Sequence, residues 1–192
     1  MTAGGRDAAR QTFTIDEYFR LPESTGPSEL VYGVCREPAA PFLRHQAVVT
    51  ALASALHEHV KRQQSGNVYV SPVDVVLDRE RALVVQPDIV FIAAARRHIA
   101  DDRVWGAPDL VVEVLSPGTA HRDRTLKLGW YRKYGVKECW LVDLRRRRIE
   151  IVDCGARPRS RRAVFAGTHS LRSGILPAFN IAPAAVFDSH AD

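Results

Sequence analysis

One acid stands inside a strongly apolar segment of the chain. Residues 110–115 read LVVEVL, so Glu113 is the one polar side chain among six. Burying an unpaired carboxylate costs several kcal/mol, and Glu113 therefore needs a partner. A divalent cation such as Mg²⁺, an arginine or lysine, or a proton would each serve.

A second acid, Asp88, opens another apolar segment, 89–92. An acid at the start of one strand and an acid within a neighbouring strand can meet at the same edge of a sheet. Their like charges repel until a divalent cation lies between them, and Mg²⁺ prefers oxygen ligands. Asp88 by itself also fits a turn position after proline. Asp109 follows a proline too, but lies roughly 13 Å along a strand from Glu113, and we expect it at a strand start or turn.

Lys127 is one of four lysines in a chain with 23 arginines. It lies in a predicted helix, about 122–134, that follows the Glu113 strand. Asp123 and Tyr131 stand one turn to either side of it. A lysine there could orient or deprotonate a water molecule. Considered alone, however, Lys127 is better explained by an ordinary ion pair with Asp123 on a solvated helix face.

The length and composition fit one globular domain. The chain has 192 residues, is 46% hydrophobic and carries a net charge of +5. We expect a flexible N-terminus at 1–12, a single domain at 13–187 and a tail at 188–192. We expect no membrane span, and three scattered cysteines favour a reducing cytoplasm. Eight arginines between 145 and 162 form a basic segment that could contact phosphates or form a solvated hairpin turn.

The order of predicted elements indicates an α/β fold. Thr14 and Glu17 form a capping box that opens a short helix to about Arg20. Apolar residues at the helical period predict a long helix from 42 or 45 to 62. Strands are predicted at 29–34, 68–70, 73–77, 82–85, 89–92, 110–115, 138–142 and 148–152, with edge strands at Val164 and 171–176. The unbroken apolar character of 110–115 is typical of a central strand covered on both faces.

Together these residues resemble the Uma2 family of endonuclease-like proteins, within the PD-(D/E)XK superfamily. The resemblance covers residues 13 to 187, and the order and spacing of the matching segments make it strong. They are 29–33 (ELVYG), 44–46 (RHQ), 72–77 (PVDVVL), 85–91 (VQPDIVF), 106–117 (GAPDLVVEVLSP), 122–127 (RDRTLK), Tyr131, 134–136 (YGV), 140–143 (WLVD) and 176–177 (LP).

The resemblance implies a restriction-endonuclease-like core, a mixed β-sheet flanked by helices with a metal site at one edge. It makes Asp88 the motif aspartate and Glu113 the acid of the (D/E)XK element. The backbone carbonyl of Val114 would join them as a metal ligand. Leu115 occupies the position where the motif lysine is expected, and Lys127 on the next helix would replace it.

The same resemblance implies further site residues. Glu29 matches the additional acid that such nucleases place early in the chain, although Tyr32 departs from the family pattern, which more often has an acid before the glycine. His45 and Gln46 would lie nearby at a helix start, with a capping or core role as the alternative for each.

The implied reaction is hydrolysis of a phosphodiester bond in DNA, assisted by Mg²⁺ or Mn²⁺. Lys127 would orient the attacking water or stabilise developing charge. Two other interpretations stay open: a catalytically silent member that binds nucleic acid or a protein, and a structural protein with a buried salt-bridge network. Homodimerisation fits the fold, through the arginine-rich hairpin or the apolar C-terminal segment.

Overall fold

The computed structural model describes residues 11–22, 28–37, 40–116, 118, 120–155 and 161–188. Within them, the larger sheet has the strand order β11-β10-β9-β8-β6-β3. Its neighbours are antiparallel except for β8 and β9, which are parallel. Its strands are β3 (Gly66–Val70), β6 (Ile89–Ala93), β8 (Leu110–Leu115), β9 (Glu138–Asp143), β10 (Arg148–Asp153) and β11 (Arg162–Ala166).

A smaller sheet has the order β2-β1-β5-β4-β7 and is also mixed, because β4 and β7 are parallel. Its strands are β1 (Glu29–Val31), β2 (Val34–Arg36), β4 (Val75–Asp78), β5 (Leu83–Val85) and β7 (Val104–Trp105). A 3₁₀ helix, η1 (Ala94–Ile99), follows β6. The α/β class is thus confirmed, with a second sheet in addition to the single mixed sheet that was expected.

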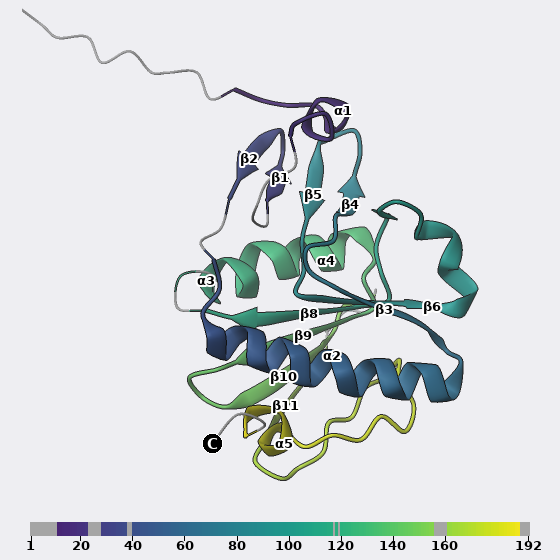
Figure 1. Ribbon diagram of the computed structural model, residues 1–192, viewed down its shortest axis with the longest axis vertical. Coiled ribbons are helices and arrows are strands. Elements are labelled where there is room, and N and C mark those ends of the chain that lie inside the picture. The colour runs from purple at the N-terminus through teal and green to yellow at the C-terminus, as the bar shows by residue number, and fades with distance from the viewer. Residues whose placement is uncertain are drawn as a thin grey trace, which may run out of the picture.

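Helices and the smaller sheet cover the two faces of the larger sheet (Figure 1). On one face, α2 (Leu43–Gln63) and α5 (Pro183–Phe187) pack against β8 and β9 through Leu52, Leu56 and Val186. On the other face, α4 (Leu128–Tyr134) and the smaller sheet share a second core with the alternate residues of β8. All six residues of β8 are buried, which confirms the prediction of a central strand.

The short first helix and the hairpin after it follow the local sequence closely. Helix α1 (Ile15–Tyr18) begins with the predicted capping box, in which the Thr14 hydroxyl accepts from the Glu17 amide at 3.2 Å. The segment 29–34, predicted as a short strand with a turn glycine, forms the hairpin of β1 and β2 with Gly33 in its turn. Tyr32 and Gly33 make its turn with φ of 50° and 83°, a left-handed pair typical of two-residue hairpins.

The predicted edge strand at 171–176 is wrong. The Ser173 hydroxyl accepts hydrogen bonds from the amides of Ile175 and Leu176, and the Gly174 amide donates to Glu138 Oε2 at 2.7 Å. Side chains therefore satisfy backbone groups that a strand would have paired. The apolar residues that suggested a strand, Leu171 and Leu176, are buried in the core of the α2 face.

The predicted helix at 122–134 is interrupted by a π-helical segment. It consists of α3 (Ala120–Arg122), a π-helical segment η2 (Asp123–Lys127) and α4. A π-helical turn is rare and frequently marks a functional site. Within this segment Asp123 and Lys127 are both buried, while Leu126 faces outward.

Two further expectations concern the ends of the chain and membranes. Of the flexible N-terminus expected at 1–12 and the tail at 188–192, residues 1–10 and 189–192 lie outside the described residues. In the part that the structure describes, no helix is both long and apolar enough to cross a bilayer.

Candidate functional site

The register between β6 and β8 brings Asp88 and Glu113 together. Ile89, the first residue of β6, pairs with Val112 across the two antiparallel strands, so Asp88 and Glu113 are the next residues along their strands beyond this pair. The backbone amide of Val114, the residue after Glu113, donates to Asp88 Oδ2 at 2.6 Å. Both acids line the same pocket, and the charge of Asp88 is one of the causes that raise the pKa of Glu113, after burial and Asp123.

Glu113 is 4% exposed and has two close partners from the helix that follows β8. Lys127 Nζ lies 2.7 Å from Glu113 Oε1, and the Tyr131 hydroxyl donates to the same oxygen. Burial raises the pKa of Glu113 to about 8, with Asp123 and Asp88 acting in the same direction and Lys127 opposing it. Lys127 thus stands beside Glu113 even though Leu115 occupies the usual lysine position.

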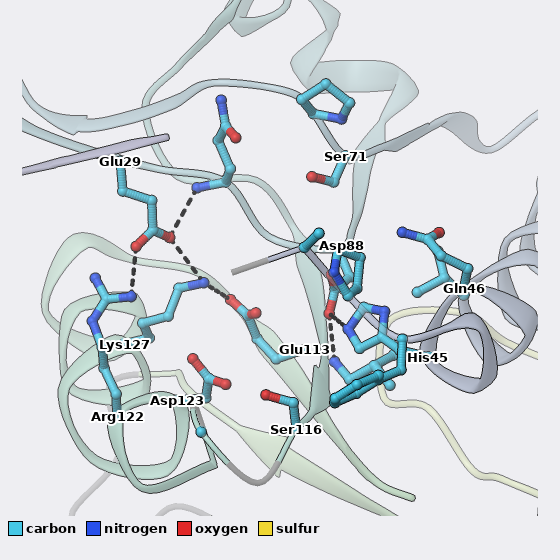
Figure 2. A pocket seen from close by; sticks show the side chains of 18 of the residues that line it. Glu29, His45, Gln46, Ser71, Asp88, Glu113, Ser116, Arg122, Asp123 and Lys127 are labelled. Carbon is cyan, nitrogen blue, oxygen red and sulfur yellow. Dashed lines mark hydrogen bonds and ion pairs between the residues drawn. The ribbon is translucent and has the colours of Figure 1, made fainter. Parts of the chain in front are cut away.

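Glu29 extends this network from β1 of the smaller sheet (Figure 2). Its carboxylate lies 3.0 Å from Lys127 Nζ and 2.6 Å from Arg122, and it accepts from the Gln86 amide at 3.2 Å. Burial alone would raise the pKa of Glu29, but Lys127 and Arg122 outweigh it and hold the pKa low. Burial likewise opposes protonation of Lys127, yet Glu113 and Glu29 raise its pKa above the usual value.

His45 reaches Asp88 from the start of α2. Its Nε2 lies 3.3 Å from Asp88 Oδ2, and its side chain is buried. Burial would lower the pKa of His45, but the hydrogen bond and the charge of Asp88 outweigh it and raise the pKa. The N-cap of α2 is Phe42, so His45 does not cap the helix. Gln46, next to it, is exposed and lines the same pocket.

Sequence reasoning gave no site role to Arg122, Asp123 or Tyr131. Asp123 is buried, lines the pocket and lies with Ser116 near Glu113 (Figure 2). Asp123, Lys127 and Tyr131 stand four residues apart on a helix that must pack against the sheet. Three polar side chains on a face that should be apolar were the signal that could have identified them.

The acids of the site, together with Lys127 and His45, line one pocket with a volume of about 570 Å³. Of the residues predicted from sequence, it contains Glu29, His45, Gln46, Asp88, Glu113, Val114 and Lys127. The described residues contain no group of three or more His, Cys, Asp or Glu side chains arranged around a metal position. The carboxylates of Asp88 and Glu113, which line the same pocket, nevertheless offer the hard oxygen donors that Mg²⁺ prefers, and Mg²⁺ keeps several waters. The donor chemistry therefore fits a hard divalent cation.

Asp109 lies at the other end of β8 and has a structural role. Its carboxylate pairs with Arg96 at 3.2 Å and Lys137 at 2.7 Å, and it accepts from the Ala93 amide at 2.8 Å. These partners join β6, η1 and the start of β9 around the beginning of β8. Asp109 thus fixes a strand start, as expected.

Acids pair with several arginines of the basic segment and with Arg124. Arg124 lies 2.8 Å from Glu150 and 3.1 Å from Asp143, Arg162 lies 2.7 Å from Glu150, and Arg146 lies 3.1 Å from Asp143. Arg157 and Arg159 lie outside the described residues. Among the described arginines of this hairpin, at least part of the positive charge is thus balanced locally.

Two comparisons with known proteins found a match to this chain. A family model, Uma2, described as "Putative restriction endonuclease", matches residues 15–184. A solved structure from Anabaena variabilis ATCC 29413, titled as a putative nuclease belonging to DUF820, has a TM-score of 0.77 at 21% identity. The match covers 92% of this chain and 98% of that one, which shows a shared fold. No curated protein matches the chain. Because the family model spans most of its length, the chain belongs to the Uma2 restriction-endonuclease-like family.

Proposed function

We propose that this protein is an endonuclease that hydrolyses phosphodiester bonds in DNA with Mg²⁺, or Mn²⁺ in its place. The observation that carries the proposal is that Asp88, Glu113 and Lys127 line one pocket, with Lys127 Nζ 2.7 Å from Glu113. Family membership and the shared fold support a nuclease. The choice of DNA and of the metal is part of the proposal.

The cation would be held by the Asp88 and Glu113 carboxylates and the Val114 carbonyl. When bound, it would supply Lewis acidity to the phosphate and lower the pKa of a water molecule. Both observed contacts to the Asp88 carboxylate are made to Oδ2, by the Val114 amide and His45. We therefore assign Oδ1 of Asp88 to the cation. His45 and the Val114 amide thus orient a ligand, as outer-shell groups do in metal sites.

Lys127 is placed to act on the water or on the charge that develops at phosphorus. Its ammonium is held from two sides by Glu113 and Glu29, which fixes its position and keeps it protonated. A protonated amine favours orienting the water and stabilising negative charge over removing a proton. Glu29 would then serve as a positioning residue for Lys127, and Arg122 in turn holds Glu29.

The main alternative is that the buried acids form a structural salt-bridge network. The observed ion pairs favour it, because Lys127 already neutralises the charge of Glu113. It would require an arginine where we place the cation. Among the described contacts, no arginine pairs with Asp88 or Glu113, and Arg122 reaches only Glu29.

The test is cleavage of supercoiled DNA, linear DNA, single-stranded DNA and RNA across a range of Mg²⁺ and Mn²⁺ concentrations. Wild type, Asp88→Ala and Lys127→Ala are compared. We expect metal-dependent cleavage of DNA by wild type alone. Cleavage that persists in both variants would reveal a contaminant, and no cleavage of any substrate would favour a silent binding protein. A homodimer and a cytoplasmic location remain predictions.

A further inference from the structure

The pocket combines two kinds of surface. Its inner part holds the buried acids and Lys127, which are suited to a cation and a phosphate. Phe42, Val70, Pro41 and Pro72 form what we call its apolar rim, and the exposed residues Arg36, Glu37 and Gln46 also line the pocket. Hydrolysis of a phosphate requires the polar floor but not the apolar rim. The combination suits a ligand that has both a charged group and an apolar group.

Phe42 is the most unusual residue of this rim. Its side chain is 75% exposed, while Val70 on the rim is 44% exposed. Clustered exposed apolar side chains mark interaction sites, because water around them is released on binding. Leu43, the next residue, is 88% exposed but does not line the pocket. The rim therefore presents an aromatic ring to whatever occupies the pocket.

The position of Phe42 is fixed relative to the acids. Phe42 is the N-cap of α2, and its carbonyl accepts from the amides of His45 at 2.9 Å and Gln46 at 3.2 Å. His45 in turn contacts Asp88 at 3.3 Å. One helix start thus carries both the ring at the rim and the side chain that orients the aspartate.

We propose that Phe42 stacks on an unpaired nucleobase next to the phosphate held at the acidic floor, so that the preferred substrate is single-stranded or frayed DNA. This inference rests on the proposed function. A base is joined to its phosphate through the sugar, so a nucleotide supplies a flat apolar ring beside a charged group. Every base has such a face, and stacking on an aromatic side chain is tolerant of sequence.

The size and composition of the pocket favour an unpaired strand over a duplex. A volume of about 570 Å³ lies within the range of small-ligand sites and suits one nucleotide. In a duplex, each base is stacked and paired, so its face is not available to Phe42. Arg36 and Glu37, both exposed, also line the pocket, and their opposite charges offset, so the proposal depends on the Phe42 ring and not on a positive rim.

The experiment measures binding to a fluorescein-labelled single-stranded oligonucleotide and to a duplex of the same sequence. Ca²⁺ replaces Mg²⁺, and gels check that the strands stay intact. Wild type is compared with Phe42→Ala, with Phe42→Tyr, which keeps a ring, and with Leu43→Ala as the matched exposed control. Sedimentation of wild type and Phe42→Ala reports the oligomeric state.

We expect wild type to bind the single strand at least about tenfold more tightly than the duplex. Phe42→Ala should lose about tenfold on the single strand, the scale of one base–aromatic stack, while Phe42→Tyr and Leu43→Ala should not. Equal binding by wild type and Phe42→Ala, or an equal loss on both DNA forms, would overturn the proposal. So would a wild-type dimer that Phe42→Ala dissociates, because a second copy would then cover the ring.

A cleavage assay separates this failure from failure of the proposed function. If wild type cuts DNA in a manner that depends on Asp88, those adverse results overturn the base site alone. If wild type binds neither DNA form and cuts nothing, the nuclease proposal and the base site fail together.

Discussion

Lys127 Nζ lies 2.7 Å from Glu113 Oε1 and 3.0 Å from Glu29 Oε1. Glu113 belongs to β8 of the larger sheet and Glu29 to β1 of the smaller one. One ammonium group therefore joins two buried carboxylates from different sheets. The same side chain that we place in the reaction also helps to hold the site together.

Replacing Lys127 by methionine keeps the length of the side chain and removes its charge. Glu113 would then lose its ammonium partner, and Glu29 would keep only Arg122. Breaking a buried ion pair costs about 3–5 kcal/mol, so we expect a loss of that size in the free energy of unfolding, measured with urea in EDTA. Lys133→Met, an exposed lysine on α4, should lose less than about 1 kcal/mol. Equal losses in the two variants would show that the buried pairs contribute little.

Asp88→Asn tests the metal ligand while retaining the fold. Asparagine keeps an oxygen that can accept from the Val114 amide, but it lacks the negative charge. We expect Mn²⁺ affinity, measured by calorimetry, to fall about 100-fold or more, with little change in melting temperature. Asp101→Asn, at an exposed position, provides the control. Unchanged Mn²⁺ affinity in Asp88→Asn would exclude Asp88 as a ligand.

The raised pKa of Glu113 predicts that metal binding depends on pH. Its pKa is about 8 because of burial, and a carboxylate must lose its proton to bind a metal. Mn²⁺ affinity should therefore increase as the pH rises from 6 to 8, by up to about tenfold per unit, and level off above the pKa. Calorimetry at several pH values measures this, and Glu113→Gln should show weak binding with little pH dependence. Wild-type affinity that is the same at pH 6 and pH 8.5 would contradict the account.

His45 predicts a pH dependence of stability with a defined sign. Asp88 raises the pKa of His45 in the folded protein above its unfolded value, which is about 6.5. The stabilisation by protonated His45 is therefore fully present below the unfolded pKa and is lost as the pH rises through the folded one. In metal-free urea denaturation, the stability difference between wild type and His45→Gln should be larger at pH 6 than at pH 9. His57→Gln, at an exposed position on α2, is the control. A difference that grows with pH would reverse the assignment.

Local signals in the sequence predicted much of the fold. The capping box at Thr14, the helical period of α2 and the apolar run of β8 each depend on neighbouring residues, and all three appear in the structure. The strand expected at 171–176 failed because apolar character alone does not distinguish a strand from a buried irregular segment. There, Glu138 and the Ser173 hydroxyl satisfy the backbone, and Glu138 is distant in sequence.

The sequence indicated which residues belong to the site better than it indicated the contacts between them. The sequence suggested Asp88 and Glu113 as site residues, because an acid within or beside an apolar strand needs a partner. The link from Lys127 to Glu29 could not be predicted, because it depends on how the smaller sheet packs against the helix after β8. The π-helical turn that carries Asp123 and Lys127 also has no local sequence signature that we could identify.

The most direct test of the central claim is to locate the cation. Crystals soaked in Mn²⁺ would be measured for anomalous scattering. The account predicts a peak between the Asp88 and Glu113 carboxylates, with metal–oxygen distances of about 2.1 Å and the Val114 carbonyl as a further ligand. A peak elsewhere, or no peak with Lys127 still the only cation beside Glu113, would contradict it.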